Sequence, residues 1–158
     1  MASSLRTDEE FAEIYNRHVD TVYRVCFSFM KNAADTEDMV QETFLKLMSC
    51  RKVFETKEHE KAWLIVTASN TCKDELRRFK RKMDYISGSL RQQEVYTDDR
   101  DGILQAVLAL PMKYKEVVYL YYYEGYQTSE ISKLLHCPAS TVRNQLSRAR
   151  ELLKRNGV

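Results

Sequence analysis

The sequence predicts an all-α protein of two small helical domains joined by a flexible linker, with a helix-turn-helix in the C-terminal domain. Apolar residues recur at intervals of three and four, the spacing of one helix face, over most of the 158 residues. Only four Gly and two Pro occur, and no long run alternates apolar and polar residues as a strand does. The periodicity stops in a stretch rich in Ser, Gly, Gln and Asp, which is typical of a linker. We therefore expect domains at residues 1–84 and 102–158, joined by a flexible linker at residues 85–101.

Three helices are expected in the N-terminal domain. The first, of about five turns, is predicted by the helical spacing of Phe11, Ile14, Tyr15, Val19, Val22, Cys26 and Phe29. Residues 32–34 break it, and Asp35 is expected to cap a second helix that carries Met39, Val40, Phe44, Leu47 and Met48. Residues 51–60 are charged and aperiodic, and they predict a loop. The third helix is expected to start near Lys61 and to carry Trp63, Val66, Leu76 and Phe79.

The C-terminal domain is expected to end in a helix-turn-helix. Helical spacing returns at residues 103–110, and Pro111 is expected to start a new helix that runs to Tyr123 and ends at Gly125. Thr128 is expected to cap a short helix that carries Ile131, Leu134 and Leu135. After a tight turn at residues 136–138, the last helix has one apolar stripe, formed by Val142, Leu146, Ala149 and Leu153. A short helix, a three-residue turn and a longer helix describe this motif.

The other face of the last helix is basic and polar, with Arg143, Asn144, Ser147, Arg148 and Arg155. Residues 140–156 hold five basic side chains (Arg143, Arg148, Arg150, Lys154 and Arg155) against one acid, Glu151. Arg can bond guanine through two hydrogen bonds and Asn can bond adenine, while a helix N-terminus can hold a backbone phosphate. The alternative is an ordinary solvated basic helix. The short helix and turn before it favour binding to duplex DNA.

A second basic cluster ends the third helix, at Lys73, Arg77, Arg78, Lys80, Arg81 and Lys82, and Trp63 lies earlier on the same helix. Aromatic and basic groups together suit single-stranded nucleic acid. Two alternatives remain open, because Trp63 also fits a core position and the cations also complement the helix dipole. The second helix is acidic at its start, with Asp35, Glu37, Asp38 and Glu42. Dipole complementation and a docking face for a basic partner explain that equally well.

Several function classes are disfavoured. The four cysteines are widely spaced and fit buried reduced thiols in a cytoplasmic protein, so we expect neither a metal nor a cofactor. No apolar stretch is long enough for a signal peptide or a membrane span, so we expect a protein without direct membrane insertion. A nuclease that used Asp98, Asp99 and Asp101 would need a nearby base, which the sequence does not offer. We therefore expect a protein that is not an enzyme.

Three stretches carry a family resemblance. Residues 35–48, DTEDMVQETFLKLM, resemble the polymerase-binding helix of sigma-70 family sigma factors. Residues 62–81, AWLIVTASNTCKDELRRFKR, resemble the helix that follows it in the family. Residues 110–154 resemble the family's C-terminal domain, with Leu-Pro-x-x-Tyr, Glu-Gly-Tyr, Thr-Val-Arg and Leu-Ser-Arg-Ala-Arg. The short chain, with no domain between these two, is similar to the extracytoplasmic-function group.

The resemblance implies a bacterial transcription initiation factor that binds core RNA polymerase and promoter DNA. The clamp of the largest polymerase subunit would be bound through Asp38, Gln41, Glu42, Phe44 and Leu45, with a further contact to the flap of the second subunit. The melted minus-ten strand, with a base flipped into a loop pocket, would be held by the loop at residues 51–60 with Arg51, Lys52, Asn70, Lys73, Arg77, Arg78 and Arg81. The duplex minus-thirty-five element would be read by Ser140, Thr141, Arg143, Asn144, Ser147 and Arg148. An anti-sigma factor is a further expected partner.

The sequence departs from the family pattern at the helix-turn-helix. His136 stands where Gly is usual and is expected to take a left-handed conformation. Pro138 stands where a capping Ser is usual, and Gln145 replaces a common basic residue. These departures bear on the promoter sequence that is recognised. The main alternative is a stand-alone dimeric helix-turn-helix regulator, which would bind duplex DNA tightly without polymerase.

Overall fold

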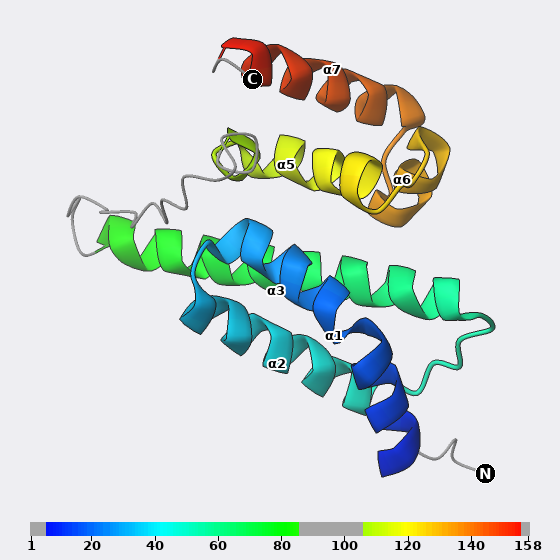
Figure 1. Ribbon diagram of the computed structural model, residues 1–158. Coiled ribbons are helices and arrows are strands. Elements are labelled where there is room, and N and C mark those ends of the chain that lie inside the picture. Colours follow the sequence, from blue (N-terminus) through cyan, green and yellow to red (C-terminus); the bar gives the residue numbers. More distant parts are fainter. Residues whose placement is uncertain (1–5, 86–105, 156–158) are drawn as a thin grey trace. The chain divides into compact units, whose positions relative to one another are not determined.

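The computed structural model describes residues 6–85 and 106–155, and every element in those ranges is helical (Figure 1). The chain divides into two compact units, Met1–Val95 and Tyr96–Val158. The all-α prediction is confirmed. Of the expected linker at residues 85–101, only residue 85 is among the described residues. Asp98, Asp99 and Asp101 lie outside them.

The first unit is built from three helices that pack against one another in pairs: α1 (Asp8–Met30), α2 (Ala33–Ser49) and α3 (Lys57–Tyr85). Its core contains Val22, Val25 and Cys26 of α1, Leu47 of α2, and Leu64, Ile65, Ala68 and Cys72 of α3, each at most 1% exposed. The core face of α3 therefore differs from the expected one. Trp63 is only half-buried, and Phe79 is 43% exposed.

The caps of the first unit correct two expected boundaries. Asn32, rather than Asp35, caps α2, because its side-chain oxygen accepts a hydrogen bond from the Asp35 backbone N–H at 2.9 Å. Helix α3 begins at Lys57, four residues before the expected start. Thr56 Oγ1 accepts from the His59 N–H at 3.0 Å, which fixes that first turn within a stretch whose charges suggested a loop. The loop proper is thus residues 50–56, between α2 and α3.

The second unit contains α5 (Met112–Val118), the π-helix η1 (Tyr119–Tyr123), α6 (Thr128–Leu135) and α7 (Ala139–Arg155). Pro111 lies just before α5 as its N-cap, and η1 continues that helix to Tyr123, the expected end. Gly125 follows with a φ of 74°. Helix α6 is capped at Gln127, whose N–H donates to Glu130 Oε1 at 3.0 Å, and not at Thr128 as expected.

The core of the second unit joins the helices of the helix-turn-helix to α5. Ile131 of α6 and Val142, Leu146 and Ala149 of α7 are at most 2% exposed, and α7 packs against both α5 and α6. The expected apolar stripe of the last helix is confirmed at these positions, while Leu153 is half-buried. In the part of the chain that the structure describes, no helix is long and apolar enough to cross a membrane.

Candidate nucleic-acid interface

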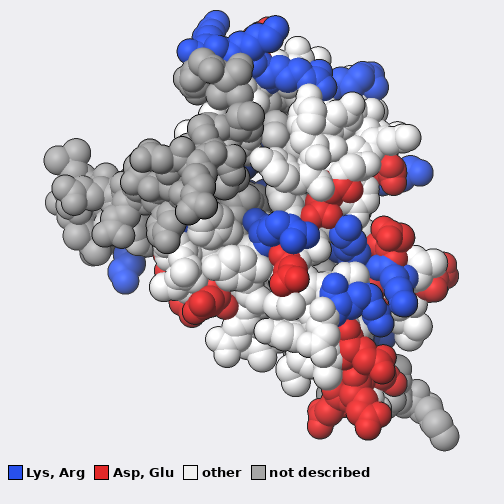
Figure 2. Space-filling model, in the orientation of Figure 1, with Lys and Arg blue, Asp and Glu red and all other residues white. Residues whose placement is uncertain are grey.

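Helix α7 presents a continuous polar face. Arg143, Asn144, Ser147 and Arg148 are all exposed, and they alternate along the sequence with the buried Val142, Leu146 and Ala149. Ser140 is exposed at the start of the helix and Thr141 is half-buried. Figure 2 shows Lys and Arg side chains gathered over α7. Because the apolar stripe fixes the rotation of the helix about its axis, the four exposed side chains share one face that can enter a groove of DNA.

The turn before α7 is held by hydrogen bonds between Cys137 and Ser132 of α6. His136 ends α6 in the left-handed region, with φ 53° and ψ 46°, as the sequence predicts. Cys137 donates its N–H to the Ser132 carbonyl at 3.1 Å, and Ser132 Oγ donates to the Cys137 carbonyl at 2.5 Å. Pro138 precedes α7 and offers no side-chain oxygen to its first turn. The turn thus sets the angle at which α7 leaves α6 despite the two departures from the family pattern.

One basic side chain of α7 lies against the protein itself. Arg150 Nε donates to the Tyr122 hydroxyl at 2.8 Å, and the guanidinium lies 5.9 Å and 5.8 Å from the ring centroids of Tyr121 and Tyr122. A cation over two aromatic rings stabilises the packing of α7 against η1. Arg150 is therefore best assigned to that contact, which leaves Arg143, Arg148 and Arg155 as the exposed arginines of the other face.

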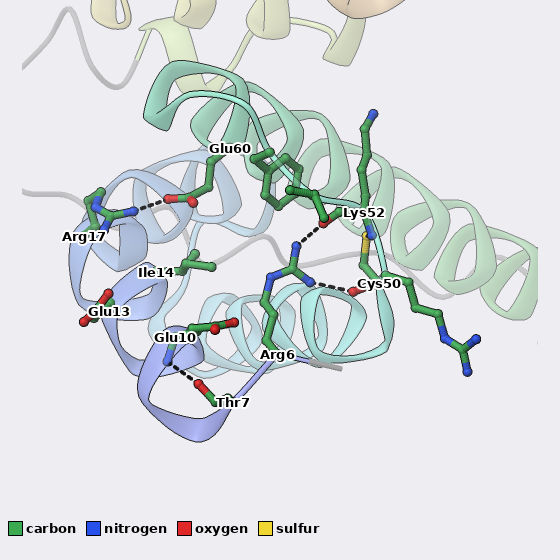
Figure 3. Close-up of a pocket in the computed structure, with 12 residues that line it drawn as sticks. Arg6, Thr7, Glu10, Glu13, Ile14, Arg17, Cys50, Lys52 and Glu60 are labelled. Carbon is green, nitrogen blue, oxygen red and sulfur yellow. Dashed lines mark hydrogen bonds and ion pairs between the residues drawn. The ribbon is translucent and has the colours of Figure 1, made fainter. Parts of the chain in front are cut away.

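The 50–56 loop forms one wall of a pocket in the first unit (Figure 3). The pocket has a volume of about 530 Å³ and is lined by the start of α1, the loop and Glu60. Arg51, Lys52 and Val53 are exposed, and Val53 is 82% exposed. An apolar side chain this exposed, beside two cations, suits contact with the bases and phosphates of a nucleic-acid strand.

Glu60, which lines this pocket, is a buried carboxylate held by two residues of α1. Glu60 Oε1 lies 2.5 Å from Arg17 Nη1 (Figure 3). It also lies 2.7 Å from His18 Nε2, so that the first turn of α3 is tied to α1. Glu60 and His18 are 8% and 5% exposed. A carboxylate with this little access to water needs such partners to offset the cost of its burial. Glu60 was expected in the loop, but it lies in the first turn of α3 and supports the pocket.

The basic part of α3 is exposed, but acids of the same helix accompany it. Asn70, Arg77, Arg78 and Arg81 are exposed and Lys73 is half-buried. Arg77 pairs with Asp74 at 3.4 Å and Arg78 pairs with Glu75 at 3.1 Å, both at the spacing of one helix turn. Exposed pairs of this kind are weak and can exchange a carboxylate for a phosphate. The ring centroids of Trp63 and Phe54 lie 5.7 Å apart, so Trp63 packs against the loop.

Helix α2 carries an exposed stripe of mixed character. Asp38, Gln41, Leu45 and Met48 lie three or four residues apart and share one side of the helix. Leu45 is 53% and Met48 47% exposed, although both are large and apolar. Exposed apolar side chains beside acids fit a docking surface for a protein partner.

Phe44 departs from the expected set of contact residues. It is 3% exposed and packs against Tyr15 and Phe11, at ring-centroid distances of 4.8 Å and 6.2 Å. Its side chain belongs to the core and holds α2 against α1, so it does not offer a surface contact. Its neighbour Glu42 is half-buried.

Arg6, Arg17, His18 and Glu60 shape the pocket, yet sequence reasoning did not single them out. Each acts through partners more than 40 residues away in the sequence, so no local spacing identifies them. Among residues 6–85 and 106–155, no group of three metal-ligating side chains occurs.

The two helical units, one with a basic third helix and one with a helix-turn-helix, define a nucleic-acid-binding protein of two modules. Comparison with known proteins identifies the family. Residues 14–82 match the model of Sigma-70 region 2, and residues 100–153 match that of Sigma-70, region 4. The chain therefore belongs to the sigma-70 family, in the group of extracytoplasmic-function (ECF) RNA polymerase sigma factors. Initiation of transcription at specific promoters follows as its function.

Individual relatives agree with this placement. The chain is 30% identical to the ECF RNA polymerase sigma factor SigM of Bacillus subtilis, over 90% of this chain and 91% of the relative. It is 28% identical to SigW of the same species, over 93% and 88%. Among solved structures, the sigma factor RpoE of Bartonella quintana, in complex with the anti-sigma factor NepR, has a TM-score of 0.74 and 21% identity. That match covers 94% of this chain and 96% of RpoE and indicates a shared fold.

Proposed function

We propose that this sigma factor divides promoter recognition between its two units. The first unit binds core RNA polymerase and holds the melted minus-ten strand, and the second reads the minus-thirty-five element as duplex. The observation that carries this proposal is that each of the two family regions has an exposed cationic surface of its own. On α7 that surface is a single helix face, and in the first unit it extends over the 50–56 loop and α3.

Helix α2 supplies the polymerase contact in this proposal. Asp38, Gln41 and Glu42 meet the basic clamp of the largest subunit, and Leu45 adds apolar contact. Complementary charge steers such an encounter, while the burial of Leu45 contributes affinity. Phe44 keeps α2 in place beneath this surface. The second unit binds the flap of the second polymerase subunit, which separates the two DNA-binding surfaces along the promoter.

The 50–56 loop and α3 hold the melted strand. A flipped base enters the pocket of about 530 Å³, and Arg51 and Lys52 neutralise phosphates at its rim. Asn70 and Lys73 extend the surface along α3, followed by Arg77, Arg78 and Arg81. The pocket's polar and aromatic lining suits a planar base with hydrogen-bonding edges.

Helix α7 reads the upstream duplex. Arg143 and Arg148 contact guanine edges or phosphates, Asn144 contacts adenine, and Ser147 lies on the same face. Ser140 and Thr141 at the N-terminus of α7 hold a backbone phosphate. The chain acts in the bacterial cytoplasm without catalysing a reaction itself, and an anti-sigma factor controls its access to polymerase.

Run-off transcription with purified core polymerase tests the proposal directly. Over a library randomised in both promoter elements, addition of this chain should create selective start sites, and core alone should not. Arg148→Ala should change the preferred upstream sequence, whereas Lys113→Ala, which removes an exposed cation from α5 of the same unit, should not. Start sites that do not depend on the added chain would contradict the proposal.

A gel shift separates this function from the stand-alone regulator. A sigma factor needs core polymerase to bind its promoter firmly, whereas a dimeric helix-turn-helix regulator binds duplex DNA alone. Tight, sequence-specific binding by the chain without polymerase would favour the regulator.

A further inference from the structure

Arg6 lies just before α1 and outside the matched region 2, yet its side chain reaches the 50–56 loop (Figure 3). Its Nη1 donates to the carbonyls of Leu47 and Cys50 at 3.2 Å and 2.5 Å, and its Nη2 donates to the Lys52 carbonyl. The guanidinium also lies 5.1 Å from the centroid of the Phe54 ring. One half-buried side chain thus contacts the end of α2 and three residues of the loop.

These contacts define the path of the loop backbone. The Leu47 carbonyl belongs to the last turn of α2, where the helix dipole is negative and attracts a cation. The Cys50 and Lys52 carbonyls lie beyond the helix, where no helical N–H is available to them. The planar guanidinium holds three acceptors in a fixed geometry, which a flexible ammonium with a single nitrogen does not reproduce.

We infer that Arg6 is a positioning residue that shapes the 50–56 loop for selection of the minus-ten base. This inference rests on the proposed role of the loop in holding the melted strand. The hydrogen bonds of Arg6 are directed at the chain's own carbonyls, so it acts on the DNA through the loop and not as a phosphate contact. Arg51 and Lys52 then project toward the strand from a backbone that Arg6 holds through the Cys50 and Lys52 carbonyls.

The substitution Arg6→Lys separates geometry from charge, because it keeps the positive charge and removes the planar guanidinium that bonds three carbonyls. Arg6→Gln removes both. Arg24→Gln is the matched control, since it removes an exposed cation from α1 that donates to Thr21 Oγ1, one helix turn away, at 3.3 Å. Unfolding of all three variants can be followed by the fluorescence of Trp63, the only tryptophan of the chain, which lies in the first unit.

Limited proteolysis by trypsin reports on the loop without any DNA. Cleavage after Arg51 and Lys52 requires local opening of the loop, and its rate follows the open population. We expect Arg6→Lys and Arg6→Gln to raise that rate by about tenfold, and Arg24→Gln to leave it unchanged. An unchanged rate in Arg6→Lys would overturn the inference, whatever the promoter experiments give.

Run-off transcription then tests selectivity. On promoters that differ in one minus-ten base, the wild-type chain should discriminate between bases. Discrimination is measured as the ratio of transcript yields on promoters with the preferred and with another minus-ten base. Arg6→Lys and Arg6→Gln should both reduce this ratio by about threefold or more, because the base is read less well. The response to upstream changes should remain that of the wild type.

Each other outcome has a definite meaning. Arg6→Lys with wild-type discrimination, beside a defective Arg6→Gln, would show that charge alone matters and would overturn the inference. An equal loss of yield on every base, with discrimination intact, would do the same. A wild-type chain that initiates nowhere or shows no minus-ten preference would instead contradict the proposed function.

Discussion

The two surfaces assigned to DNA are held in place in opposite ways. On α7, one periodic stripe of buried residues sets the rotation of the helix, so neighbouring positions decide what is exposed. The 50–56 loop has no such period, and its path is set by Arg6 and by the support that Arg17 and His18 give to Glu60. A helical recognition surface is thus encoded locally. A loop surface depends on partners distant in the sequence, so it can be altered from outside the loop.

The largest effect should come from the stripe that positions α7. Leu146→Ala removes a side chain that is 2% exposed between α7 and its neighbours, and should lower the free energy of unfolding of the second unit by about 2–5 kcal/mol. Hydrogen exchange of the α7 amides measures this. The exposed Ser147→Ala serves as the control for that measurement. A change below about 1 kcal/mol for Leu146→Ala would mean that the stripe does not hold the helix.

Arg148→Ala should leave that stability unchanged and weaken promoter binding by the polymerase complex. The expected loss is about 1–3 kcal/mol on promoters with the preferred upstream base, and smaller on others, because an arginine that bonds a base edge carries sequence information. Competition binding with core polymerase on a set of upstream variants measures it. An equal loss on all variants would point to a phosphate contact.

Glu60→Gln should loosen the support of the pocket. The substitution weakens the contacts to Arg17 and His18, and we expect a loss of about 1–2 kcal/mol in the first unit, since Arg17 is itself about one-third exposed. Urea unfolding followed by Trp63 fluorescence measures this loss. Glu58→Gln, at an exposed position of the same helix turn, should have no comparable effect.

The smallest effect concerns the turn. His136 holds a left-handed backbone with φ 53°, which costs a side-chain-bearing residue more than it costs Gly. His136→Gly should therefore raise the stability of the second unit by about 0.5–1 kcal/mol, after the greater chain entropy of Gly is deducted. Slower hydrogen exchange in α6 and α7 would confirm this, and faster exchange would show that the imidazole makes a contribution of its own.

The sequence predicted the helical architecture and the exposed face of α7 because both follow from spacing within one helix. The family resemblance also predicted the left-handed His136, because Gly is usual at that position of the turn. The two helix caps that were predicted wrongly share one cause. Asp35 and Thr128 are competent caps, but Asn32 and Gln127 come first and take that role.

Tertiary contacts explain the remaining differences. Phe44 lies on the apolar stripe of α2, so family resemblance and burial gave it conflicting roles, and packing against Tyr15 decides for the core. Arg6 and Glu60 were not identified, because their partners lie 41 to 46 residues away and nothing in the sequence between them marks the contact. Loop geometry in this unit is a property of the folded chain and not of the segment.

The central claim is that one chain reads two promoter elements through surfaces that are fixed independently. Run-off transcription with core polymerase, over a library randomised in both elements, tests it with Arg148→Ala and Arg6→Lys side by side. The account predicts that Arg148→Ala shifts preference only in the upstream element, and that Arg6→Lys shifts it only in the minus-ten element. If either variant changes both preferences to the same extent, the two surfaces do not act separately and the account is wrong.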